Sequence, residues 1–122
     1  MDIDSFHKVL EDAAAEIPDE LMRELNGGIS ILPEAKVHPK THERAIYIMG
    51  EYRVEIPGLG RYINLYYGSF EKVFGIGTPS DDPRLKEEIR KTLLHELRHH
   101  IEMLSGVRDL EIQDEVTLSK WI

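Results

Sequence analysis

Apolar residues recur every three or four positions between residues 82 and 105, which is the spacing of one side of an α-helix. Asp82 and Pro83 stand at its start, where an N-cap and a first helical residue are expected. Ser105-Gly106 is typical of a helix end. We therefore predict one long helix over about 82–105. Its apolar stripe consists of Leu93, Leu97, Ile101 and Leu104.

The rest of the chain predicts shorter elements. Strand-forming residue types and alternating polarity predict three strands, at 29–32, 44–49 and 61–67. Further helices are predicted at 2–15, 18–25, 70–74 and 109–121. Residues 34–44 and 50–60 are predicted to be irregular connections. The whole chain, 1–122, is then one α+β domain. We expect a small, mostly antiparallel three-stranded sheet packed on the long helix, with helices near both termini.

The long helix carries the motif His-Glu-x-x-His at residues 95–99. His95 and His99 lie one turn apart on the same helix face, so both imidazoles can point at one metal ion. Glu96 is turned about 100° from His95. That position suits a general base that holds a zinc-bound water and takes its proton. The apolar stripe is centred opposite the histidines. The alternative interpretation is a solvated polar helix face that happens to contain these residues.

A catalytic zinc ion usually has three protein ligands, so a third ligand must lie elsewhere. Asp109 is our first choice, because Gly106 can turn the chain back after the helix. Glu102 shares the His95 face, but it is better placed to pair with Arg98 at i+4. Asp109 could equally be the N-cap of the final helix. The remaining candidate ligands are Glu111, Asp114 and Glu115.

The other histidines and the tyrosines give weaker signals. His100 is about 140° round the helix from His95, so it cannot share the metal. We expect it either to hydrogen-bond around the ligands or to lie at the surface. His38 and His42 are predicted to be plain loop residues. A tyrosine hydroxyl near the metal could stabilise an oxyanion, but the sequence does not select one from Tyr47, Tyr52, Tyr62, Tyr66 and Tyr67.

Composition narrows the function classes. The 122 residues are 41% hydrophobic and carry a formal net charge of −8, which argues against nucleic acid or an anionic membrane as partner. There is no apolar run of transmembrane length and no signal-peptide pattern at the N-terminus, so we expect a cytoplasmic protein. The chain has no cysteine, so a metal must be held by histidine and carboxylate.

Three stretches resemble the small bacterial zincin-like metallopeptidases. They are the motif helix from His95 to His100 with the following Gly106-Val107-Arg108-Asp109, and upstream Gly60-Arg61-Tyr62-Ile63 and Tyr66-Tyr67-Gly68-Ser69-Phe70. The resemblance implies a minimal zincin fold with a closing C-terminal segment, zinc at His95 and His99, and Glu96 as general base. Compact members follow His-Glu-x-x-His-x-x-Gly-x-x-Asp, with the aspartate as third ligand. Here Gly106 comes four residues late, and the charged Arg98 is a second departure.

The expected function is therefore zinc-dependent hydrolysis of a peptide bond. The expected substrate is a small peptide or an unfolded protein segment, lying extended along the predicted strand 61–67 as an added strand. The main alternative is a metal-binding or interaction module with this fold and little or no turnover. A metal-dependent nuclease is disfavoured by the acidic balance and by the lack of a third histidine after His99.

Overall fold

The computed structural model describes residues 1–39, 45–55 and 60–107. Its helices are α1 (Ile3–Ala15), the 3₁₀ helix η1 (Asp19–Met22), α2 (Tyr67–Phe74) and α3 (Pro83–Val107). Its strands are β1 (Gly28–Leu32), β2 (Lys36–Val37), β3 (Tyr47–Ile48), β4 (Gly50–Glu55) and β5 (Gly60–Tyr66). The α+β class is confirmed. The predicted final helix at 109–121 lies outside the described residues.

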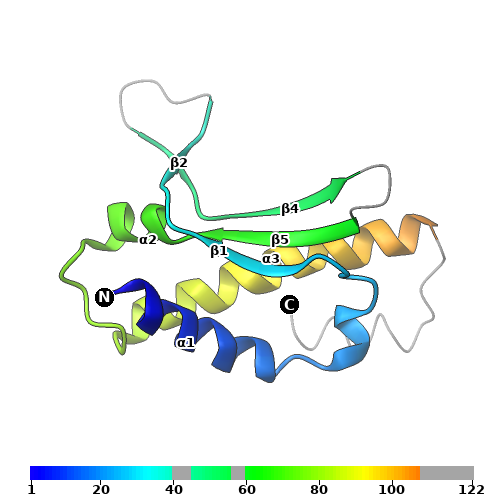
Figure 1. Ribbon diagram of the computed structural model, residues 1–122, viewed down its shortest axis with the longest axis horizontal. Coiled ribbons are helices and arrows are strands. Elements are labelled where there is room, and N and C mark those ends of the chain that lie inside the picture. Colours follow the sequence, from blue (N-terminus) through cyan, green and yellow to red (C-terminus); the bar gives the residue numbers. More distant parts are fainter. Residues whose placement is uncertain (40–44, 56–59, 108–122) are drawn as a thin grey trace.

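The main sheet has three strands in the order β1-β5-β4. β5 runs antiparallel to β4 and parallel to β1, while β2 and β3 form a separate antiparallel pair. The sheet is thus mixed, and our expectation of a mostly antiparallel sheet was wrong in this detail. β1 and β5 can be parallel because β2, β3 and β4 separate them along the chain, so no tight hairpin fixes their direction. Figure 1 shows β2 and β3 projecting away from this sheet.

β4 occupies a segment predicted to be irregular. The signal was present, because charged residues at 51, 53 and 55 alternate with Tyr52 and Val54. The pairing runs from Gly50 opposite Leu65 to Glu55 opposite Gly60. β5 therefore has a partner on each side and cannot accept an added strand. The prediction of residues 61–67 as the substrate-binding edge was wrong, and the edges of this sheet are β1 and β4.

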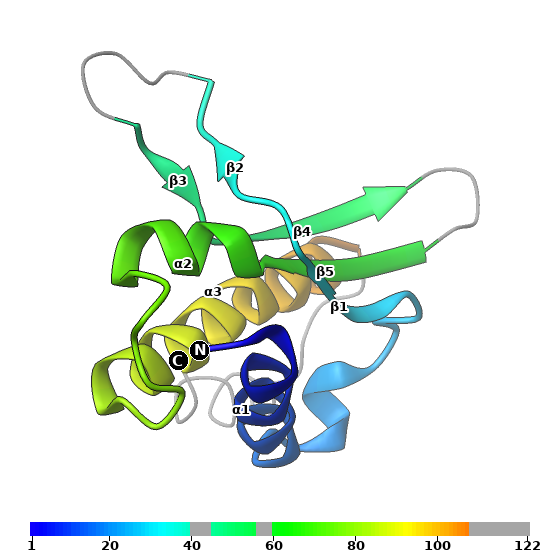
Figure 2. The ribbon, with the colours of Figure 1, turned by 60° about the vertical axis from the view of Figure 1, so that its left-hand side comes forward.

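α3 lies under the sheet together with α1, so both helices cover the same face (Figures 1 and 2). The predicted stripe is buried, with Leu93 and Leu97 fully excluded from solvent. At the start of α3 the Asp82 carboxylate accepts a hydrogen bond from the Arg84 backbone N–H at 2.8 Å, which caps the helix as predicted. The helix continues through Gly106 to Val107, slightly beyond the expected end. The core is completed by Phe6, Leu10, Ile63, Leu65, Phe70, Leu85 and Ile89.

None of the helices described is both long and apolar enough to serve as a membrane span.

Candidate metal centre

His95 and His99 meet on the solvent-exposed side of α3. Their Nε2 atoms are 3.2 Å apart. The ring centroids are separated by 4.7 Å, and the ring planes are nearly perpendicular at 87°. The two Nε2 atoms are within hydrogen-bond distance, so both rings turn the same nitrogen towards one place on the helix surface. The structure thus brings the two predicted ligands together on the side of α3 that is opposite the apolar stripe.

The separation between these two nitrogens fits a zinc ion. Zinc binds imidazole nitrogen at about 2.0–2.1 Å in tetrahedral geometry, so two such ligands lie about 3.3 Å apart. The observed 3.2 Å between Nε2 of His95 and Nε2 of His99 matches that value. The side chains are therefore already spaced as two corners of a tetrahedral site.

Glu102 pairs with Arg98 and does not meet the Nε2 atoms of the two histidines. Arg98 donates through Nε to Glu102 Oε1 at 2.9 Å, which is the predicted i+4 pair. The other carboxylate oxygen is 3.9 Å from His99 Nδ1, on the opposite side of the ring from Nε2 and too far for a hydrogen bond. Within residues 1–39, 45–55 and 60–107, no three His, Asp or Glu side chains form a metal-binding group. The other candidates, Asp109, Glu111, Asp114 and Glu115, lie outside the described residues.

Glu96 is buried in the contact between α3 and β4. Burial raises the pKa of its carboxyl. Nearby His95 and His99, together with the backbone N–H of Tyr52, act in the other direction and favour the charged carboxylate. The net direction is upward, which brings the pKa of Glu96 closer to the range in which a carboxylate is an effective general base.

A cleft of about 430 Å³ opens beside this carboxylate. Its walls come from the end of β3 and the start of β4 on one side and from α3 on the other. Both His95 and Glu96 line it, so the candidate ligand and the candidate base face the same space. Gly50 allows β4 to approach α3 closely, because a Cβ there would lie 2.8 Å from Thr92 Cγ2 and 3.3 Å from Glu96 Cγ. The full lining is Ile48, Met49, Gly50, Glu88, Lys91, Thr92, His95 and Glu96.

His100 does not have the role expected from the sequence. Its side chain is fully buried, so the surface position was wrong. Its hydrogen-bond partners are also not the metal-ligand candidates. Nδ1 is 2.8 Å from the Tyr52 hydroxyl, and Nε2 is 2.7 Å from the Arg23 carbonyl oxygen. Burial lowers the pKa of this imidazole, which favours its neutral form.

Four of the five tyrosine hydroxyls already have partners. Tyr52 bonds to His100 at 2.8 Å, and Tyr62 donates to Glu55 at 2.6 Å. Tyr66 donates to Glu51, and Tyr67 donates to the Met1 carbonyl at 2.9 Å. The structure therefore does not single out any of these four as an oxyanion donor. Sequence reasoning missed the importance of Tyr52 because it placed that residue in an irregular connection.

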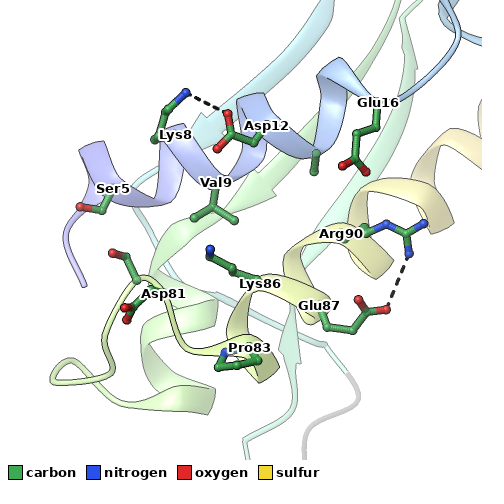
Figure 3. Close-up of a pocket in the computed structure, with 12 residues that line it drawn as sticks. Ser5, Lys8, Val9, Asp12, Glu16, Asp81, Pro83, Lys86, Glu87 and Arg90 are labelled. Carbon is green, nitrogen blue, oxygen red and sulfur yellow. Dashed lines mark hydrogen bonds and ion pairs between the residues drawn. The ribbon is translucent and has the colours of Figure 1, made fainter.

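A larger cavity, of about 560 Å³, lies in the groove between α1 and the first half of α3 (Figure 3). It shares no residue with the histidine motif. Much of its charge is balanced within single helices, since Lys8 pairs with Asp12 at 2.8 Å and Arg90 with Glu87 at 3.7 Å. Ion pairs of this exposed kind are typical of a solvated groove. Size alone therefore does not identify the reactive site.

Comparisons with known proteins found both a family and a similar solved structure. A family model described as zincin-like metallopeptidase matches residues 34–117. The solved structure of a conserved hypothetical protein from Thermus thermophilus is similar, with a TM-score of 0.69 and 36% sequence identity. That similarity covers 86% of this chain and 98% of the other. A search of curated proteins gave no significant match.

Proposed function

The chain belongs to the zincin-like metallopeptidase family, and from that premise we propose that it hydrolyses peptide bonds with zinc as its cofactor. One observation carries the proposal. His95, whose Nε2 lies 3.2 Å from that of His99, lines the same cleft as the buried Glu96 carboxylate. A pair of metal-binding imidazoles next to a carboxylate with a raised pKa is the arrangement that metal-assisted hydrolysis requires.

His95 and His99 would hold the ion, with Asp109 as the proposed third ligand. Bound there, zinc would polarise the scissile carbonyl and lower the pKa of the attacking water. Asp109 follows α3 after only one intervening residue. It is therefore close enough in sequence to reach back towards the histidines, although Glu111, Asp114 and Glu115 remain alternatives.

Glu96 is the proposed general base. Its carboxylate would accept a proton from the water that attacks the carbonyl carbon and then donate that proton to the leaving amine. Burial between α3 and β4 supports this role, since it raises the pKa of the carboxyl and so strengthens its hold on the transferred proton. A zinc ion held by His95 and His99 would favour the ionised carboxylate, because positive charge beside a carboxyl lowers its pKa.

We propose β4, in place of β5, as the strand that positions the substrate. Among the described strands, β4 pairs only with β5, so the part of its outer side that does not face Glu96 is open to an added strand. Its first residue, Gly50, lines the cleft together with His95 and Glu96. An extended peptide or an unfolded protein segment pairing with this edge would run directly past the reactive groups.

The decisive comparison is wild type against Glu96→Gln on a broad peptide library. Removing the base should lower kcat/KM by about 10²–10⁴-fold. Elemental analysis should still find one zinc per chain, because Glu96 is not a ligand. Glu88→Gln is the matched control, since Glu88 lines the same cleft without a proposed role; its activity should stay near that of wild type.

Equal inertness of wild type and Glu96→Gln would contradict the peptidase proposal. If such inert protein still bound one zinc, a metal-binding or interaction module would be the better description. Protein without any affinity for zinc would contradict the metal centre as well.

A further inference from the structure

Tyr52 contacts α3 at two points. Its backbone N–H is close enough to the Glu96 carboxylate to favour the charged form, and its side-chain hydroxyl lies 2.8 Å from His100 Nδ1. Glu96 and His100 are four residues apart, so they lie on the same side of the helix. Tyr52 of β4 thus contacts two successive turns of α3.

The hydrogen bonds of His100 fix its tautomer. The Arg23 carbonyl oxygen, 2.7 Å from Nε2, can only accept a hydrogen bond, so Nε2 must carry the proton. A neutral imidazole then has a lone pair at Nδ1, which accepts from the Tyr52 hydroxyl. Both ring nitrogens are therefore satisfied in a fully buried side chain. Losing either partner would leave a buried polar atom without its bond, which is costly.

The Arg23 carbonyl, which ends this series of hydrogen bonds, lies next to a residue with an unusual backbone conformation. Arg23 follows η1 directly, and Glu24 has a φ of 62°, in the left-handed region that residues other than glycine rarely adopt. Such a conformation persists only where surrounding contacts hold it. Here the neighbouring carbonyl of Arg23 is directed at His100. The connection thus runs from η1 through His100 to β4.

Gly50 provides a second contact in register with the first. Its close approach is to Thr92 and Glu96, one turn before the pair contacted by Tyr52. Two residues of strand advance about 6.8 Å and four residues of helix about 6 Å. β4 and α3 therefore advance by nearly the same distance between the Gly50 contact and the Tyr52 contact. Glu96 takes part in both contacts.

We propose that Tyr52 and His100 are positioning residues that fix β4 against α3 and thereby set the place of the Glu96 carboxylate. The kinetic part of this inference rests on the peptidase function proposed above. Neither residue touches the reacting atoms. They would act through the Tyr52 backbone N–H, whose location depends on the hydroxyl anchored to His100.

The first test is Tyr52→Phe, which keeps the ring and removes only the hydroxyl. We expect kcat to fall about tenfold, the lower end of the loss expected when a residue that orients a reactive group is removed. KM and zinc affinity should stay within about twofold, because the cleft and both ligands are untouched. Tyr62→Phe is the control, since it removes a hydroxyl bonded at 2.6 Å to Glu55. Equal kcat in both variants would overturn the proposal.

The second test separates positioning from general stability. The amide of His100→Asn reaches the place of Nδ1 and can still accept from Tyr52, whereas that of His100→Gln reaches the place of Nε2 and can donate only to Arg23. Both variants should melt at lower temperature. Compared where both are folded, the asparagine variant should keep kcat within about threefold of wild type, and the glutamine variant should lose about tenfold. Equal losses would mean a purely structural role.

A measurement without turnover distinguishes this inference from the function itself. The side-chain carboxyl ¹³C resonance of Glu96 should shift in Tyr52→Phe and stay in place in Tyr62→Phe. An unchanged resonance in Tyr52→Phe would overturn the positioning role whatever the activity. An inactive wild type with the expected shift would overturn the peptidase function alone.

Discussion

At the scale of single residues, the short separation between β4 and α3 depends on glycine, which has no side chain, at position 50. Any Cβ at position 50 would lie 2.8 Å from Thr92 Cγ2, well inside van der Waals contact, and 3.3 Å from the Asn64 carbonyl oxygen. Thr92 cannot simply rotate away, because its hydroxyl donates to the Glu88 carbonyl at 2.8 Å. The cleft and the base therefore depend on glycine at this position for steric reasons.

We accordingly expect Gly50→Ala to lower the free energy of unfolding by about 1–3 kcal/mol, the usual cost of overpacking. The measurement is urea denaturation followed by circular dichroism. Gly77→Ala is the control, because nothing lies within 4 Å of a Cβ at that position; it should change stability by less than about 0.5 kcal/mol.

The clash should be relieved by a second substitution on the helix. Thr92→Ser removes Cγ2 and keeps the hydroxyl that bonds to Glu88. The double variant Gly50→Ala/Thr92→Ser should therefore be more stable than the sum of the single effects predicts. Strict additivity would show that the two positions do not compete for space.

At the scale of elements, the long helix could be predicted almost completely and the sheet only in part. α3 has its cap, its apolar stripe and both histidines in one continuous segment, so the relevant information is local. Sheet order depends on which distant segments pair, and alternation within residues 61–67 cannot reveal that β5 has neighbours on both sides. For the same reason the pairing of Tyr52 with His100 was out of reach, since 48 positions separate them.

The carboxylate of Glu51 links three strands through hydrogen bonds. Glu51 on β4 accepts from Lys36 on β2 at 2.6 Å and from the Tyr66 hydroxyl at the end of β5. Burial by itself would raise the pKa of Glu51, but these hydrogen bonds and the positive charge of Lys36 outweigh it and bring the pKa below its ordinary value of 4.5. A pKa that is lower in the folded state means that the ionised carboxylate stabilises the fold.

The sign of the pH dependence follows. The contribution of Glu51 is fully present above about pH 4.5 and is lost as the pH falls through the lower folded-state pKa. Glu51→Gln should thus cost about 1 kcal/mol at pH 7, and the deficit should shrink towards pH 3, as measured by denaturation across pH. Glu87→Gln, which breaks an exposed pair with Arg90, should cost less than about 0.5 kcal/mol at any pH. A deficit in Glu51→Gln that is equal at pH 3 and pH 7 would point to packing instead of charge.

At the scale of the whole molecule, the candidate metal centre lies outside the core. The core joins α1, η1, β5, α2 and α3 through apolar contacts, whereas His95 and His99 are on the exposed side of α3. Folding and metal binding should therefore be separable. Protein stripped of metal should keep its helical circular dichroism, unlike small domains that fold only around zinc.

Zinc should nevertheless raise stability by mass action. Free zinc at 100 times its Kd adds about 2.7 kcal/mol, which corresponds to a rise in Tm of roughly 10 °C for a domain of this size. His99→Ala should abolish the shift, and Asp109→Ala should reduce it at the same zinc concentration. A full shift in Asp109→Ala would transfer the third-ligand role to Glu111, Asp114 or Glu115. A full shift in His99→Ala would contradict the proposed centre.

The division of α3 into three faces restricts how the gene can change in length. Leucines point to the core, His95 and its neighbour His99 to the exposed side, and His100 to η1 and β4. Inserting or deleting one codon between Leu85 and His100 would rotate everything on one side of the change by about 100°, so no two faces would keep their partners. Relatives of different length should therefore carry their gaps in the connections between elements, and this stretch of helix should align without a gap.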